Sequence, residues 1–166
     1  MLQIRLAQAS DAAAIAALHA KNWQQVYCGV LSAAYLSEQV PAERLALWNE
    51  RLARPDHNQR IWLAENDGEL CGFVCAYAAQ DARWGTYIDN LHVAASQRGQ
   101  GLGLRLLAAV AHWHESLGYI DTGLYLWVIE ENTHAIQFYK RCAAQSKDLD
   151  LWHAPDGSAV PSIRMV

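Results

Sequence analysis

The sequence predicts a mixed α/β fold, an α+β arrangement with about six or seven strands in one sheet and helices on both faces. Two features lead to this prediction. In the first half, short apolar runs follow one another through a tight turn, which indicates antiparallel strands. In the second half, a strand, a helix and a strand come in that order, and such a crossover joins parallel strands. We therefore expect an antiparallel N-terminal part and a parallel central pair.

Turn and cap residues set the expected elements of the first half. Ser10 is a good N-cap for a first helix, and Pro41 fits the first turn of a later helix that ends before Pro55. The pair Asp67-Gly68 supplies the positive φ values of a hairpin turn. Apolar runs bounded by such residues predict strands at 3–6, 61–65, 70–77 and 87–93.

The second half opens with a long amphipathic helix, for which Gly118 is a natural C-cap. One face of this helix carries apolar residues at helical spacing, namely Leu102, Leu106, Val110, Trp113 and Leu117. Further elements are expected as a strand at 124–128, a short helix at 133–142 and a final hairpin of 148–153 with 162–166.

Composition limits the classes of protein and partner. The chain of 166 residues is 52% hydrophobic and 18% charged, which is typical of one globular domain over residues 1–166. A net charge of −4 gives no reason to expect nucleic acid. No apolar run approaches the roughly 20 residues that span a membrane, and the N-terminus lacks a secretory pattern. We expect a cytoplasmic protein without a membrane partner, in which Cys71 and Cys75 are buried free thiols.

A glycine-rich segment, Arg98-Gly99-Gln100-Gly101-Leu102-Gly103, follows a strand and opens a helix. This order directs main-chain N–H groups and the positive end of a helix dipole at one point, which favours a phosphate. The P-loop pattern fails because Leu104 and Arg105 follow the last glycine. The dinucleotide pattern fails on the spacing of the third glycine. The alternative, a turn that binds nothing, is disfavoured because each glycine adds chain entropy that folding must remove.

This segment resembles the R-x-x-G-x-G motif of the Gcn5-related N-acetyltransferase (GNAT) family. A second motif, N-x-x-A-x-x-F-Y, matches Asn132, Ala135 and Phe138-Tyr139. Val93 lies five residues before Arg98, where the family ends a strand. The resemblance covers about Gln3 to Cys142. It implies the GNAT acyl-CoA N-acyltransferase fold, with acetyl-CoA as donor and an amine as acceptor.

The resemblance also implies which residues hold the donor. The diphosphate would lie on the N–H groups of the glycine segment, that is Arg98, Gly99, Gln100, Gly101, Leu102 and Gly103. The strand before it carries a bulge in the family and splays from its neighbour, and the pantetheine arm pairs there with the main chain of Leu91, His92 and Val93. Asn132 would bond the same arm, and it is also a plausible helix N-cap.

Direct transfer requires a neutral amine and a protonated leaving group. Asp89 is the first choice of base, since it lies four residues before Val93 and period-two geometry puts both on one side of the strand. Glu130 and Glu131 are second choices, and a solvated or ion-paired role for each carboxylate stays open. Tyr139 matches the family's general acid; the alternative is a packed core aromatic.

The remaining polar and aromatic residues point less clearly to a role. His112 and His114 face different sides of a helix, and no cluster has zinc spacing, so we expect no metal. His92 is either a wall of the substrate site or a packing residue. Four aromatic residues lie in segments that line the acceptor side in the family, with core packing as the alternative: Trp23, Tyr27, Tyr35 and Trp84.

The expected reaction is acetyl transfer to a small primary amine, an amino acid or a peptide amine. The alternatives are transfer to a protein N-terminus or lysine, and a non-catalytic acyl-CoA binding module. The negative net charge mildly favours a cationic acceptor. Dimers are common in the family, and no residue here sets their geometry. One departure is that no glycine follows Phe138-Tyr139, where the family closes the short helix with one.

Overall fold

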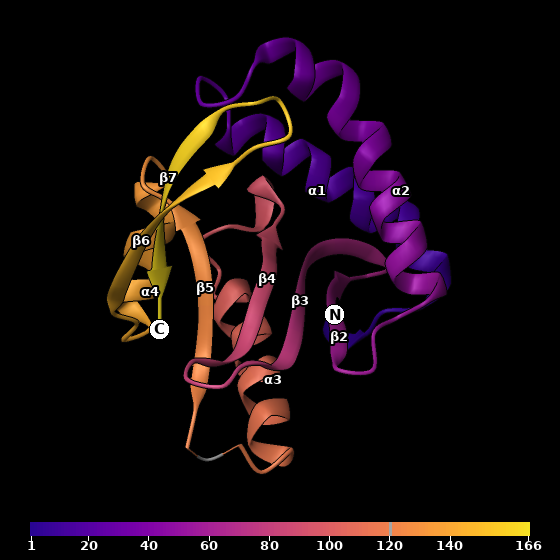
Figure 1. Cartoon of the computed structure of the whole chain (residues 1–166). Coiled ribbons are helices and arrows are strands. Elements are labelled where there is room, and N and C mark those ends of the chain that lie inside the picture. Colours follow the sequence, from indigo (N-terminus) through magenta and orange to yellow (C-terminus); the bar gives the residue numbers. More distant parts are fainter. Residues whose placement is uncertain (120) are drawn as a thin grey trace.

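One mixed sheet forms the centre of the computed structural model, which describes residues 1–119 and 121–166 (Figure 1). The order of its strands is β1-β2-β3-β4-β5-β7-β6. Strands β1 to β4 are antiparallel, β4 and β5 are parallel, and β5, β7 and β6 are antiparallel. The predicted mixed sheet and parallel central pair are therefore confirmed. The strands are β1 (Leu2–Leu6), β2 (Gln59–Asn66), β3 (Glu69–Asp81), β4 (Gly85–Val93), β5 (Gly123–Ile129), β6 (Ser146–His153) and β7 (Ala159–Met165).

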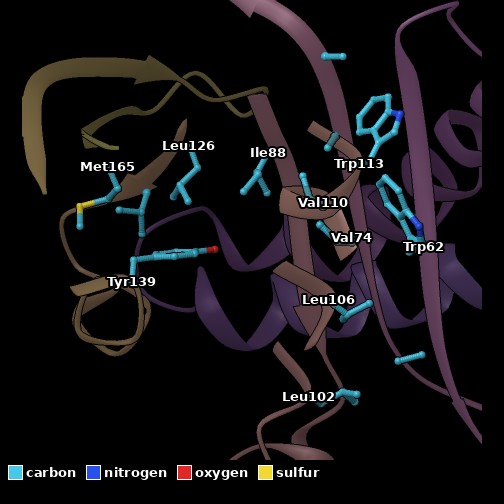
Figure 2. Packing of buried hydrophobic residues seen from close by; sticks show 14 of the residues in the cluster. Trp62, Val74, Ile88, Leu102, Leu106, Val110, Trp113, Leu126, Tyr139 and Met165 are labelled. Atoms are coloured by element: carbon cyan, nitrogen blue, oxygen red, sulfur yellow. The ribbon is translucent and has the colours of Figure 1, made fainter. Parts of the chain in front are cut away.

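Helices cover both faces of this sheet. The α-helices are α1 (Ala12–Val26), α2 (Val40–Ala53), α3 (Leu102–Ser116) and α4 (Thr133–Arg141). Shorter helical turns are η1 (Ala9–Asp11), η2 (Tyr35–Gln39) and η3 (Ala95–Gln97). Alternate residues of β2 show the two faces: Trp62 packs in a cluster with Leu106 of α3, as Figure 2 shows, whereas Leu63 packs with Ile15 of α1 and Trp48 of α2.

The turns and caps follow the sequence with one exception. Asp67 and Gly68 have φ of 51° and 84°, so the predicted hairpin turn is confirmed. Ser10, however, is not an N-cap, because it lies inside η1. The Asp11 carboxylate accepts the Gln8 N–H at 2.7 Å instead, and Arg5 holds that carboxylate at 2.8 Å. The Asp11 carboxylate, which is held by its ion pair with Arg5, therefore caps the start of η1.

The turn after α4 takes the family's left-handed geometry without a glycine. Ala143 has φ of 67°, and the Ala144 N–H donates to the Tyr139 carbonyl oxygen at 3.0 Å, which closes the helix. A side chain in this conformation costs about 1 kcal/mol. The end of α4 is thus closed without the glycine.

Strand β4 carries an irregularity at the centre of the sheet. Cys75 of β3 is opposite Asn90 and Ala76 is opposite Ile88, so Asp89 is an extra residue, a β-bulge. Beyond this bulge β4 leaves β5: in the described chain the two strands pair only where 85–87 meets 123–125. The bulge and the divergence open the middle of the sheet at one end.

Candidate active site

A cavity of about 1230 Å³ lies where β4 and β5 diverge. Its walls come from the two strands, the glycine segment, α1, α2, α4 and β6. Every residue predicted for the site lines this cavity except Gln100, whose amide donates to the Ser96 carbonyl oxygen at 3.4 Å. Pockets for one small ligand are typically about 300–1,000 Å³, so this volume is large enough for a donor and an acceptor together.

The open edge of β4 offers main-chain groups to the cavity. The Ala94 N–H donates to the Cys71 carbonyl oxygen at 2.8 Å, which fixes the phase of the antiparallel ladder with β3. In that phase the main chain of His92 faces β3, whereas the N–H and C=O groups of Leu91 and Val93 face the gap toward β5. An extended ligand can pair with them there as an added strand.

The glycine segment presents N–H groups at the other end of the cavity. Gly101 has φ of 76° and immediately precedes α3, whose first internal bond runs from the Arg105 N–H to the Gly101 carbonyl oxygen at 3.1 Å. The N–H groups of 102–104 precede that bond, so they have no acceptor within the helix. A Cβ added to Gly101 would meet no described atom within 4 Å, so the loop is open on this side. This geometry suits an anion.

Gly103 serves packing rather than the open loop. A Cβ at this position would lie 3.1 Å from Cζ of Phe138, a residue of α4. The expectation that Gly103 lets a ligand approach is therefore refined, because the Phe138 ring occupies part of that space. The contact joins the two sequence motifs, since the glycine of one receives the phenylalanine of the other.

The Arg98 side chain links α1 to the end of β4. Its Nε donates to the Val93 carbonyl oxygen at 3.3 Å, and its Nη2 donates to Oδ1 of Asn22 at 3.1 Å. Asn22 Nδ2 donates to the same Val93 carbonyl oxygen at 3.3 Å. These bonds occupy the Val93 carbonyl and leave its N–H facing the gap. No sequence motif pointed to Asn22.

Tyr139 is a buried residue of α4 that borders the cavity. Figure 2 shows its ring extending away from α4, with the hydroxyl at the far end. Burial, followed by the nearby Cys142 and Tyr27, raises the pKa of the Tyr139 phenol above its ordinary value. The hydroxyl therefore stays protonated near neutral pH. Asn132 begins the same helix and caps it, since its Oδ1 accepts the Ala135 N–H at 3.1 Å.

Asp89 lies in the cavity wall but not on the expected side of the strand. Its Oδ2 accepts from Nη1 of Arg51 at 2.7 Å, and the same nitrogen donates to Oδ1 of Asn90 at 3.0 Å. Asp89 thus faces α2, whereas the Val93 side chain packs near Leu106 of α3. The period-two argument was wrong because the bulge adds one residue between them. Glu130 and Glu131 are exposed and are not among the residues that line the cavity.

Two histidines stack in the cavity wall. The rings of His19 and His92 have centroids 4.6 Å apart, and His19 Nδ1 accepts from the Trp48 indole at 2.9 Å. Burial, helped by neighbouring arginines, lowers the pKa of His92 to about 4 and also lowers that of His19. Both rings are neutral near pH 7. Two roles were open for His92, a wall of the substrate site or a packing residue. The ring both lines the cavity and packs against His19.

This pair is expected to make the fold sensitive to acid. The folded-state pKa of each imidazole lies below the unfolded value of about 6.5, so the unfolded chain takes up protons first as the pH falls. From about pH 7 to about pH 5, the free energy of unfolding should fall by about 2 kcal/mol for each imidazole. Urea unfolding at several pH values measures this slope. In His92→Gln, the part of this fall in the free energy of unfolding that His92 causes should disappear. In His57→Gln, at an exposed site, the full fall should remain. Equal slopes in both variants would contradict the assignment.

Aromatic and cationic side chains form the end of the cavity between α1, α2 and β6. Trp23, Tyr27 and Trp152 line it, with Trp23 and Trp152 in edge contact at 5.7 Å. Tyr35 is buried in the neighbouring core cluster, and Trp84 stacks with Arg83, so neither forms the wall. No motif pointed to Trp152 or to the two arginines of α2 that reach this end, Arg44 and Arg51.

No group of three or more metal-binding side chains comes together in 1–119 and 121–166. No helix within the same residues is long and apolar enough to cross a membrane. Cys71 and Cys75 are buried free thiols, as predicted.

Comparisons with known proteins agree on one family. The model of the acetyltransferase (GNAT) family matches residues 19–144. A probable N-acetyltransferase of Mycobacterium tuberculosis, Rv2775, is 32% identical over 84% of this chain and 78% of its own length. The L-ornithine N5-acetyltransferase NATA1 of Arabidopsis thaliana is 35% identical over 55% of this chain and 40% of its own length.

A solved structure shares the fold over nearly the whole chain. The PaiA N-acetyltransferase of Thermoplasma acidophilum, in complex with coenzyme A, has a TM-score of 0.74 with 14% identity, and the match covers 98% of each chain. The family match spans both the glycine segment and the Asn132–Tyr139 motif that meet at the cavity. By its sequence, its fold and these matches, the chain belongs to the GNAT family of acetyltransferases.

Proposed function

We propose that this protein transfers the acetyl group of acetyl-CoA directly to the primary amine of a small molecule, an amino acid or a peptide. One observation carries the proposal: a single cavity joins the N–H groups at the start of α3, the open edge of β4, and the side chains of Tyr139 and Asp89. These are the parts that a donor, an acceptor and two proton transfers require.

The donor end is formed mainly by main-chain groups. The diphosphate of acetyl-CoA would rest on the N–H groups of 102–104, and the pantetheine arm would pair with Leu91 and Val93. Asn132 lines the cavity beside this path, and its amide nitrogen remains available because only its oxygen serves the cap. When bound, acetyl-CoA supplies an acetyl group already activated as a thioester.

The acceptor end must deliver a neutral amine. An alkylamine has a pKa near 10 and is mostly protonated at pH 7. Asp89 would accept the ammonium proton, directly or through water. The cationic side chain of Arg44 also lines this end, and positive charge lowers the pKa of a bound ammonium group. Arg51 also fixes the position of the Asp89 carboxylate through their ion pair.

Transfer forms a C–N bond and breaks the C–S bond of the thioester. The Val93 N–H would donate to the carbonyl oxygen as negative charge develops on it. Tyr139 would give its proton to the departing thiolate. A free phenol is a weaker acid than a thiol, and burial raises the pKa of Tyr139 further. The transfer therefore depends on the departing thiolate, whose poor solvation in the same site raises the pKa of the thiol as well.

The hairpin of β6 and β7 at the acceptor end favours a small acceptor over a folded protein. The turn between β6 and β7 is attached to the segment after α1, since Asp156 Oδ2 accepts the Ser32 N–H at 2.8 Å. Trp152 of β6 packs against Trp23 of α1 at the same place. The hairpin, drawn in yellow in Figure 1, therefore covers this end of the site. We also place the enzyme in the cytoplasm, because its four cysteines are free thiols.

A panel of amines with acetyl-CoA, followed by release of free thiol, tests the proposal. Amine-dependent release is expected, together with heat in calorimetry when CoA binds. Binding without release for any amine would instead indicate an acyl-CoA binding module. Well-folded protein that gives neither heat nor a thermal shift with CoA would contradict the proposal entirely.

A further inference from the structure

Arg44 is a largely buried arginine at the acceptor end, and its guanidinium lacks a hydrogen-bond partner in the described chain. Its side chain is 13% exposed, and its Nε is buried and unsatisfied. The nearest carboxylate oxygen, Oε2 of Glu43, is 3.6 Å from Nη2, which is too far for a hydrogen bond. That oxygen already accepts the Tyr35 hydroxyl at 2.6 Å. A buried guanidinium without a partner is costly, so a ligand is expected to complete it.

The surroundings of Arg44 hold it in place without using its N–H groups. Its guanidinium carbon lies 4.2 Å from the centroid of the Trp23 ring, a cation–π contact. Both side chains line the cavity. A guanidinium offers five donors in a planar fork that matches the two oxygens of a carboxylate. The site therefore presents a fixed fork to whatever occupies the acceptor end.

The charged side chains that line this end, Arg44, Arg51 and Asp89, carry a net positive charge, although the chain as a whole is negative. Asp89 pairs with Arg51 at 2.7 Å, whereas the carboxylate beside Arg44 belongs to Glu43, which forms a looser ion pair at 3.6 Å and does not line the cavity. Burial also lowers the pKa of Arg44, as expected for a cation removed from water. A purely cationic acceptor, which the net charge of the whole chain mildly favoured, would place more positive charge here.

We propose that Arg44 binds a carboxylate of the acceptor, so that the preferred substrates are amines that also carry a carboxylate group. The inference rests on the proposed acetyl transfer and specifies its acceptor. Asp89 and Arg44 then recognise opposite ends of a zwitterion, because Asp89 faces the ammonium group and Arg44 the carboxylate. Both charged groups of the ligand are matched, and Arg44 gains the partner that it lacks.

Pairs of amines that differ only in a carboxylate test this proposal: L-lysine with cadaverine, L-ornithine with putrescine, and L-phenylalanine with phenethylamine. For pairs that are acetylated, we expect kcat/KM to favour the carboxylate-bearing member about tenfold or more, as a charge-assisted bidentate contact implies. In Arg44→Gln this ratio should fall toward one, mainly because KM rises for the carboxylate-bearing member. Arg44→Lys, which keeps the charge but not the fork, should give an intermediate ratio.

Arg60→Gln is the matched control, since Arg60 also stacks on a tryptophan, Trp113 at 5.2 Å, but does not line the cavity. It should keep the wild-type ratio. A thermal shift with CoA shows that each variant is folded. The proposal is overturned if the carboxylate-free amines react as well as their partners, or if Arg44→Gln keeps the wild-type ratio. Absence of thiol release with every amine would instead overturn the proposed acetyl transfer, and this inference with it.

Discussion

Replacement of Tyr139 by phenylalanine is expected to lower kcat for acetyl transfer about 100-fold, while binding of CoA changes little. The substitution removes only the hydroxyl of a side chain that borders the cavity, and this hydroxyl stays protonated because burial raises its pKa. Without that proton the C–S bond must break to a bare thiolate in a poorly solvated site, which is unfavourable. Steady-state thiol release gives kcat, and calorimetry with CoA gives the affinity.

Tyr125→Phe provides the comparison for this experiment. Tyr125 is also a buried tyrosine, but it lies on β5, stacks with Tyr87 and is not among the residues that line the cavity. Its hydroxyl should therefore contribute nothing to turnover. If Tyr139→Phe retains wild-type kcat, Tyr139 is a packing residue and not the acid. The proposed binding of CoA would be unaffected by that result.

The donor end of the site could be predicted from the sequence because its geometry is local. The segment from Arg98 to Gly103 combines positive φ at Gly99 and Gly101 with the start of a helix. Both features depend on neighbouring residues alone. The Asn132 cap and the position of Tyr139 likewise follow from one short helix. The element order also fixed the parallel central pair, because a crossover through α3 permits no other pairing.

The acceptor end could not be predicted in the same way, because its side chains meet only through packing. Arg44, Arg51 and Trp152 come from α2 and β6, far apart in the chain, and no motif connects them. The side of β4 to which the Asp89 side chain points could not be predicted, for a related reason. Whether a strand carries a bulge depends on its register with β3, and that register is set by the whole sheet.

Substitution of Gly101 by alanine is expected to weaken CoA binding about tenfold or more. Gly101 has φ of 76°, and a Cβ there would project into space that no described atom fills, on the side where the diphosphate is proposed to lie. The methyl group would therefore displace the ligand from the N–H groups of 102–104, in addition to straining the backbone by about 1 kcal/mol. Calorimetry measures the affinity, and urea unfolding measures the strain.

Gly118→Ala separates these two effects. Gly118 follows the other end of the same helix with φ of 80°, and a Cβ there would also meet no described atom within 4 Å. It should lose about the same 1 kcal/mol of stability, yet it lies outside the cavity and should bind CoA as the wild type does. Equal affinities for CoA in the two variants would mean that the main chain at the start of α3 does not hold the diphosphate. In that case the donor could not be placed at the glycine segment at all, whatever the fate of the acceptor end.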